Sequence, residues 1–215
     1  MQIKNVRVYG LEESIIRSSW PHQIGEPMDF KYEYPQQFTP DEKDDNRAFK
    51  LANTPTGSGH NNFLKGIIVQ FDLQYPEYFS PQLQRYHWID IVSSQSKMHK
   101  LTSTKDISNN CNKYVLTETI RSVNYLIELY NKNEFPCIYE SEDDYETIDS
   151  REACFNYIIS NLPSGYLKWM GISTNYLQLK TIYSQRRTHK LNEWQEFCNW
   201  IENLPMSELI INKNE

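Results

Sequence analysis

Residues 162–187, with the sequence LPSGYLKWMGISTNYLQLKTIYSQRR, carry the strongest indication of the fold. Their second half predicts a helix that starts at Asn175, and residues four, seven and eleven positions further on share its face. Asn175 and Arg186 therefore lie on one face, with Leu179 and Ile182 between them. An amide and a guanidinium so placed suit contact with one extended ligand. The alternative is that Leu179 and Ile182 belong to the core and that Arg186 complements the helix dipole.

Positive charge is concentrated in two stretches of an acidic chain. The formal net charge is −6, yet basic residues gather in 82–100 and 180–190, and no Asp or Glu occurs between Gly171 and Asn192. Local positive charge in a negative protein is expected for an anionic ligand, because a focused cleft overcomes the long-range repulsion. The alternative is that the cations only cover two solvent-exposed helices.

The composition predicts a cytoplasmic protein that forms one domain over residues 1–215. Its N-terminus is too polar for a signal peptide, and no segment approaches the roughly 18 apolar residues of a membrane-spanning helix. The four cysteines have no C-x-x-C spacing, so we expect reduced thiols and no metal site.

The hydrophobic pattern predicts a mixed α and β domain with helices in the majority. Strands are expected at 3–9 and 67–73, and loops at 20–40 and 140–149. Gln82 and Arg85 are three residues apart, which places them on one face of a predicted helix. The other helices are expected at 11–19, from 41 to about 51, and at 111–131, 149–161, 175–187 and 191–203.

Two of these helices have a clear apolar stripe. In 191–203 the residues expected to face inward are Trp194, Phe197, Cys198 and Ile201. In 111–131 the stripe comprises Val115, Leu116, Thr119, Val123, Leu126, Ile127 and Tyr130.

Several classes of enzyme chemistry have no support in the sequence. No serine lies in a G-x-S-x-G elbow, and no cysteine is paired with a histidine in sequence. Phosphate-binding loops and dinucleotide fingerprints are absent, which disfavours kinase and Rossmann hypotheses. The sequence pI of about 5.5 disfavours nucleic-acid binding through the basic stretches.

The order of these pieces resembles the flavin-dependent thymidylate synthases over nearly the whole chain. That family has a Gly-His loop before a strand, matched by Gly59-His60, and then a Gln-x-x-Arg, matched by Gln82 and Arg85. The most specific match is the last, in which Leu162-Pro163, Asn175 and Arg186 fall at the family spacing without gaps.

The chain departs from the family pattern in its flavin-binding signature, R-H-R-x-x-S-x-N-E-x-S-x-R. The signature begins here with Arg85-Tyr86-His87, and its later part is Val92-Ser93-Ser94-Gln95-Ser96-Lys97, which keeps the cation at the end. Gln95 stands at the position of the serine near the pyrimidine, flanked by Ser94 and Ser96. Further departures are Asn62 and Lys65 for a Thr and a Glu, and Ile159 and Leu177 for two arginines.

The resemblance implies an α+β fold with a central, mostly antiparallel sheet and long packed helices. It also implies an enzyme that binds FAD and moves a one-carbon unit or a hydride onto a uridylate-type nucleotide such as dUMP, with folate as carbon donor and NADPH as reductant. Arg186 is implied to orient and polarise the pyrimidine. The family forms homotetramers with sites built across subunits, so Arg85 and Arg186 are implied to meet in trans. The implied substrate-binding residues are Gln82, Arg85, Gln95, Ser96 and Lys97, and the implied FAD-binding residues are His60, Asn62, His87 and Asn175.

The altered signature leaves a second hypothesis open. The chain is then a catalytically silent nucleotide-binding or interaction protein on the same fold.

Overall fold

The computed structural model describes residues 1–26, 41–55, 57–135, 137–139 and 145–211, with the backbone alone over 137–139 and 145–147. These residues form two compact units. We refer to Met1–Leu73, Leu83–Ser93 and Gly171–Glu215 as the first unit, and to Gln74–Gln82 and Ser94–Met170 as the second unit. One domain over 1–215 stays a prediction.

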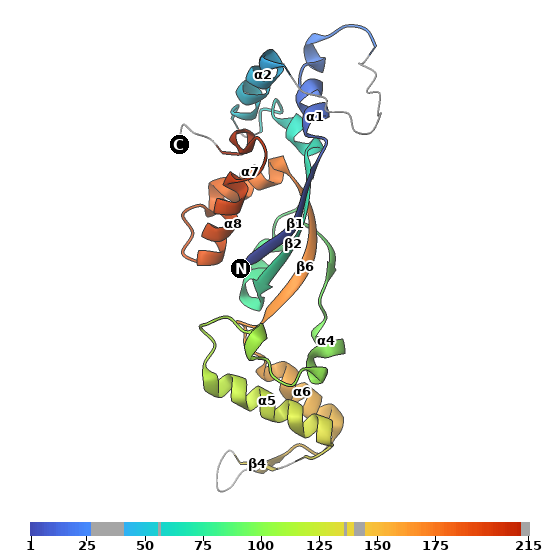
Figure 1. Cartoon of the computed structure of the whole chain (residues 1–215), viewed down its shortest axis with the longest axis vertical. Helices are drawn as coiled ribbons and strands as arrows, with labels where there is room; N and C mark the ends of the chain where they lie inside the picture. Colours follow the sequence, from blue (N-terminus) through green and yellow to red (C-terminus); the bar gives the residue numbers. More distant parts are fainter. Residues whose placement is uncertain (27–40, 56, 136, 140–144, 212–215) are drawn as a thin grey trace. The chain divides into compact units, whose positions relative to one another are not determined.

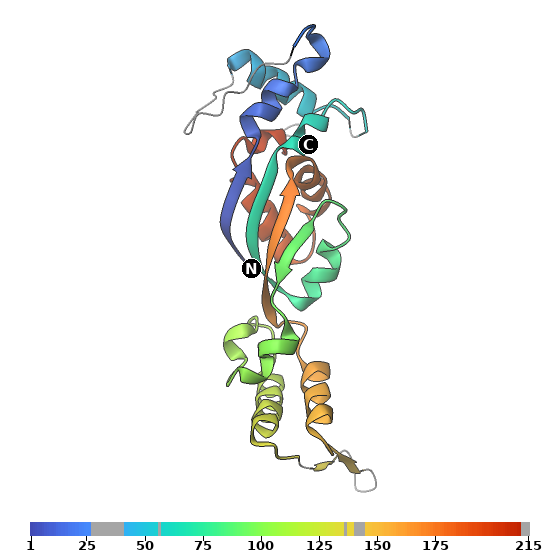
Figure 2. The same cartoon turned by 90° about the vertical axis from the view of Figure 1, so that its right-hand side faces the viewer.

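A four-stranded sheet organises the fold, with strand order β1-β2-β6-β3. Neighbouring strands run in opposite directions, as the arrows in Figure 2 show. The α+β class with an antiparallel central sheet is therefore confirmed. The predicted strands at 3–9 and 67–73 are present, and β3 and β6 are additional to the prediction. The strands are β1 Gln2–Tyr9, β2 Ile68–Pro76, β3 Asp90–Ser94 and β6 Leu167–Asn175.

Among the described residues, four helices lie wholly within the first unit, and all four were predicted within a few residues. In Figure 1, α7 and α8 lie against one face of the sheet. Phe71 of β2 packs there on α8, with ring centroids 6.0 Å from Phe197 and 4.5 Å from Trp200. Trp194, Phe197, Cys198 and Ile201 are buried as predicted. The helices are α1 Leu11–Arg17, α2 Glu42–Ala52, α7 Tyr176–Arg186 and α8 Asn192–Glu202.

Side-chain caps mark the start of three of the longer helices. Asp41 accepts a hydrogen bond from Asp44 N at the start of α2, at 2.7 Å. Ser150 does the same for α6, and Asn175 for α7. Such caps stabilise a helix because they satisfy an N–H group that has no partner within the helix.

Two long helices dominate the second unit, α5 Thr117–Lys132 and α6 Arg151–Asn161. They pack side by side (Figure 1) around a core that includes Val123, Ile127, Cys154 and Ile158. The remaining elements are α3 Ser80–Leu83, α4 Lys97–Lys100, and an antiparallel pair of strands, β4 Cys137–Tyr139 and β5 Tyr145–Thr147.

Short 3-10 helices connect several of these elements. They are η1 Trp20–His22, η2 Asn62–Gly66, η3 Glu77–Phe79, η4 Leu101–Ser103, η5 Ser108–Asn110 and η6 Ser207–Leu209. No helix among the described residues has both the length and the apolar character needed to cross a membrane.

The start of α5 corrects the prediction of a helix from residue 111. Cys111 instead forms a β-bridge with Tyr166, and Asn112 N donates to Gly165 O at 2.9 Å. These contacts keep Cys111 and Asn112 out of a helix, and a turn follows in which Val115 N donates to Asn112 O at 3.2 Å. The helix therefore starts only at Thr117, and Leu116 is 69% exposed.

The helix predicted to carry Gln82 and Arg85 is also shorter than expected. It ends at Leu83, and a turn follows in which Tyr86 N donates to Leu83 O at 3.2 Å. Arg85 lies in that turn, so the two side chains do not share a helix face.

Both predicted loops contain regular structure. Residues 145–147 form β5, because they pair with β4, and residues 20–22 form η1. Residues 27–40 and 140–144 lie outside the described part of the chain.

The two ends of the predicted 111–131 stripe differ in burial, which gives a stability test. Ile127 is 2% exposed in the core of the second unit. Ile127→Ala is therefore expected to lower the free energy of unfolding by about 2–5 kcal/mol, through lost burial and the cavity left behind.

The matched control is Leu116→Ala, for which the expected change is within about 0.5 kcal/mol, because the side chain is on the surface. Urea unfolding followed by circular dichroism measures both variants. Equal losses would contradict the observed start of α5.

Candidate functional site

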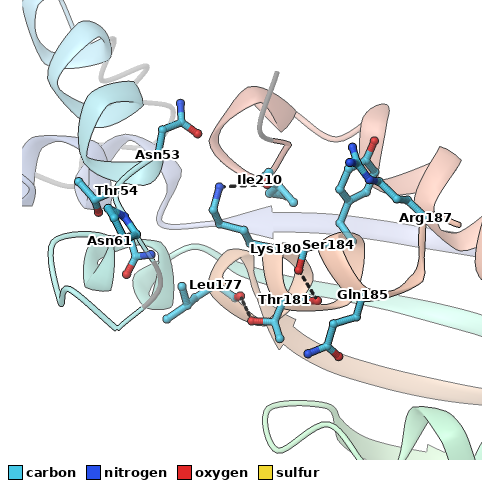
Figure 3. A pocket seen from close by; sticks show the side chains of 12 residues that line it. Asn53, Thr54, Asn61, Leu177, Lys180, Thr181, Ser184, Gln185, Arg187 and Ile210 are labelled. Atoms are coloured by element: carbon cyan, nitrogen blue, oxygen red, sulfur yellow. Dashed lines mark hydrogen bonds between the residues drawn. The ribbon is translucent and has the colours of Figure 1, made fainter. Parts of the chain in front are cut away.

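A cavity of about 480 Å³ opens along α7 in the first unit. We call it the α7 cavity, and Figure 3 shows how its walls combine α7 with the segment that follows α2. The volume falls within the roughly 300–1,000 Å³ typical of small-molecule and cofactor sites. The lining residues are Asn53, Thr54, Pro55, Asn61, Leu177, Lys180, Thr181, Tyr183, Ser184, Gln185, Arg187 and Ile210.

The α7 cavity has positive charge and hydrogen-bonding groups, and none of its described lining residues is acidic. Lys180 Nζ donates to Ile210 O at 3.2 Å, which directs the ammonium group across the cavity (Figure 3). Arg187 directly follows the end of α7. The wall therefore suits an anionic ligand with an adjoining apolar part, for which Leu177 and Ile210 offer contact.

Tyr183 supports this wall from the core side. Its hydroxyl donates to Glu202 Oε1 at 2.6 Å. Burial, together with this hydrogen bond, raises the pKa of Tyr183 to about 12. The phenol is therefore neutral at physiological pH and links α7 to α8.

Arg186, the predicted catalytic residue, is held beside this cavity by aromatic side chains. Its guanidinium carbon lies 4.8 Å from the ring centroid of Trp194 and 5.6 Å from that of Tyr86. Arg186 Nε donates to Tyr86 Oη at 2.7 Å, and that hydroxyl donates to Gln185 Oε1 at 3.1 Å. Since Gln185 lines the cavity, two hydrogen bonds connect Arg186 to the cavity wall.

The face of α7 that carries Asn175 and Arg186 is largely buried in the core of the first unit. Leu179 and Ile182 between them are fully buried, which confirms the alternative stated for these two residues. Asn175 is buried as well, and its Oδ1 caps α7 by accepting from Gln178 N at 2.9 Å.

A second cavity, of about 400 Å³, lies within the second unit. We call it the lysine cavity. It brings together Gln95, Ser96 and Lys97, three of the five predicted substrate-binding residues. None of its described lining residues is acidic. They are Gln95, Ser96, Lys97, His99, Lys100, Leu101, Thr104, Asn110, Tyr166 and Lys168.

Two lysines of this cavity share one carboxylate. Glu77 Oε1 lies 2.8 Å from Lys168 Nζ and 3.6 Å from Lys97 Nζ. Burial acts to lower the pKa of Lys168, but contact with the Glu77 carboxylate and with Tyr75 outweighs burial, and the pKa is raised. Lys168 therefore remains charged.

Gln95 and Ser96 also have structural roles at the edge of this cavity. Gln95 Oε1 accepts from Trp169 N at 3.1 Å, and Gln95 N donates to Trp169 O at 2.9 Å. Ser96 Oγ accepts from Met98 N at 3.1 Å and caps the short helix α4. These contacts hold both side chains at the entrance to α4.

The other predicted site residues line neither cavity. Gln82 is half-buried in α3, and Arg85 is exposed in the turn after it. His60 and Asn62 are exposed where the chain enters η2, next to Asn61, which does line the α7 cavity. His87 is exposed, with its ring 4.8 Å from that of Trp88.

Sequence reasoning missed four cavity-lining residues with chemistry of their own. Lys180 and Arg187 lie seven positions apart in the second basic stretch, so helical spacing was a signal for a shared face. Lys168 and Tyr166 gave no such signal, because Lys168 lies on β6, a strand that was not predicted, and Tyr166 lies directly before it in a β-bridge to Cys111.

The fold defined by these elements is that of the flavin-dependent thymidylate synthases. In sequence, no known protein family and no curated protein matches the chain. In structure, the chain is similar to the flavin-dependent thymidylate synthase ThyX from Helicobacter pylori complexed with FAD and dUMP, with a TM-score of 0.64 and 15% identity over 100% of this chain and 99% of that chain. A second structure of ThyX from the same organism, also with FAD and dUMP, gives a TM-score of 0.64 and 15% identity over 100% and 98% of the two chains. At this identity the comparison shows the fold.

The contact between Tyr86 and Arg186 gives a test of how the site is built. Tyr86→Phe removes the hydroxyl that joins Arg186 to Gln185. The free energy of unfolding is expected to fall by about 1–2 kcal/mol, because a hydrogen bond to a charged group is lost.

Tyr125→Phe serves as the control, since this tyrosine is 54% exposed on α5. Chemical unfolding of both variants measures the difference. No loss of stability in Tyr86→Phe would mean that the hydroxyl does not anchor Arg186.

Proposed function

We propose that this protein is an enzyme that binds FAD and acts on a uridylate-type nucleotide, by one-carbon transfer or by reduction. The observation that carries the proposal is the lysine cavity, in which Gln95, Ser96 and Lys97 line one cationic wall. The H. pylori structures, which share the fold over nearly their whole length, are complexed with FAD and dUMP. Folate as the carbon donor and NADPH as the reductant belong to the same proposal.

The lysine cavity suits the phosphate end of the nucleotide. Lys97, Lys100 and Lys168 are cationic hydrogen-bond donors around it, and phosphate oxygens are strong acceptors. Because Gln95 Oε1 is used by Trp169, its NH₂ group is the part that serves as a donor to a ligand. Gln82 and Arg85 complete the proposed set of substrate-binding residues.

The α7 cavity suits a flavin nucleotide by its donor set. Lys180 and Arg187 would complement the pyrophosphate, and Thr181 and Ser184 would offer hydroxyl groups. FAD, when bound, supplies hydride transfer. The side chains implied for its binding, His60, Asn62, His87 and Asn175, stay part of the proposal.

Arg186 is proposed to orient and polarise the pyrimidine ring. A guanidinium is suited to this because it is always charged and donates in a fixed planar geometry. Stacking on Trp194 and the bond to Tyr86 restrict its orientation before any ligand arrives, and such preorganisation is what electrostatic catalysis requires. A homotetramer in which Arg85 and Arg186 meet in trans is proposed with it.

A second candidate is a catalytically silent nucleotide-binding or interaction protein on this fold. It is favoured by the altered signature at 92–97 and by Leu177, which stands in the α7 cavity where the family pattern has an arginine. The two candidates agree on nucleotide binding and differ on turnover. The test is to incubate the protein with dUMP, FAD, a one-carbon folate and NADPH. Formation of a methylated or reduced nucleotide would support the first candidate, the enzyme.

Nucleotide binding is tested by calorimetric titration of the purified chain with dUMP. Lys97→Gln is expected to weaken binding by about tenfold or more, since a charged hydrogen bond to phosphate is lost. Lys105→Gln is the matched control, because Lys105 is exposed in the same unit and does not line the cavity. If Lys97→Gln binds dUMP like the unchanged protein, or if the unchanged protein binds no dUMP, the proposal fails.

A further inference from the structure

The most unusual feature outside the residues implied by the resemblance is the carboxylate of Glu77. Its Oε1 faces Lys168 Nζ at 2.8 Å and Lys97 Nζ at 3.6 Å. This oxygen is shielded from solvent, and the side chains of Glu77, Lys97 and Lys168 are only 22%, 31% and 15% exposed. Partly buried charges of this kind interact more strongly than surface pairs.

The backbone fixes Glu77 beside the strand that carries Lys168. Glu77 N donates to Tyr166 O at 3.1 Å, and Tyr78 N donates to Ser164 O at 3.1 Å. Lys168 follows Tyr166 by two residues, and its ammonium lies 5.8 Å from the ring centroid of Tyr75. The carboxylate and this ammonium are therefore held together by the main chain as well as by their charges.

The lysines and the glutamate of this cluster occupy different positions relative to the lysine cavity. Lys97, Lys100 and Lys168 line the lysine cavity, whereas Glu77 does not line it and contacts two of these lysines. With His99 counted as neutral, three lysines and one glutamate leave two positive charges. A phosphomonoester carries about −1.5 to −2 at neutral pH, which matches this excess.

We propose that Glu77 is a specificity-determining residue, which holds Lys97 and Lys168 on the cavity wall and matches the charge of the cavity to a phosphomonoester over a diphosphate. Lys168 is a further residue that binds the phosphate. The proposal rests on the proposed nucleotide site and adds to it the residue that sets the net charge of the cavity. Glu77 acts through the two lysines and is a positioning residue.

The consequence is that ligand preference follows the net charge of this cluster. Glu77→Gln keeps a side-chain oxygen beside Lys168 and removes the negative charge. The affinity for a diphosphate is therefore expected to rise more than the affinity for a monophosphate. Lys168→Gln removes a positive charge and is expected to weaken the binding of both ligands. The double variant Glu77→Gln with Lys168→Gln restores the net charge and is therefore expected to restore the preference of the unchanged protein.

The experiment is calorimetric titration of the full chain with dUMP, dUDP, inorganic phosphate and pyrophosphate. Glu77→Gln is expected to shift the ratio of affinities by about fivefold toward the diphosphate in both pairs, as one unit charge at a distance of several ångströms predicts. Lys168→Gln is expected to weaken the binding of dUMP by about tenfold. Lys105→Gln is the control, for which no change in binding is expected. Far-ultraviolet circular dichroism checks that every variant is folded.

The outcomes separate this inference from the proposed function. If Lys97→Gln loses dUMP while Glu77→Gln and Lys168→Gln bind all four probes like the unchanged protein, the inference is wrong and the nucleotide site stands. If phosphate and pyrophosphate respond as expected while dUMP binds no better than phosphate, the inference stands and the nucleotide proposal fails. Binding of none of the four probes by the unchanged protein would overturn both.

Discussion

The junction between β6 and α7 joins the sheet to the helix that lines the α7 cavity. Asn175 ends the strand and caps the helix through Gln178 N. The next residue, Tyr176, is fully buried, its N–H donates to Ile67 O and its hydroxyl donates to Pro205 O. One strand-to-helix turn therefore connects the sheet, α7 and the C-terminal segment, and the α7 cavity inherits its geometry from that turn.

Electrostatic focusing makes an acidic protein suitable for an anionic ligand. The chain carries a net charge of −6, yet neither cavity has an acidic side chain among its described lining residues. Two carboxylates outside the cavity linings orient lining side chains: Glu202 accepts from the Tyr183 hydroxyl, and Glu77 pairs with Lys168. Such an arrangement keeps charged groups in place before a ligand binds, which reduces the cost of ordering them on binding.

The helices could be predicted from sequence where an apolar stripe and a capping residue coincide, as at Asn175 and Ser150. The prediction failed where a tertiary contact competes with local preference. The bridge between Cys111 and Tyr166 delays α5, and the turn after Leu83 separates Gln82 from Arg85. Strand β3 is exposed along its length, so it has no alternation of apolar and polar residues to detect.

The candidate site was predictable only in part. Gln95, Ser96 and Lys97, which line the lysine cavity, could be singled out because they lie next to one another at a family motif, and their binding of substrate stays a prediction. The pairing of Glu77 with Lys168 joins residues that are 91 positions apart, and it depends on how the end of β2 lies beside β6. No local pattern encodes such a contact, since it exists only once the strands have paired.

Uptake of FAD most directly tests the proposal that this protein binds a flavin. The purified chain is incubated with FAD, separated from free FAD by gel filtration, and examined by visible absorption. We expect flavin absorption bands that elute with the protein in a stoichiometric amount. A colourless protein peak, with all FAD in the small-molecule fraction, would contradict it.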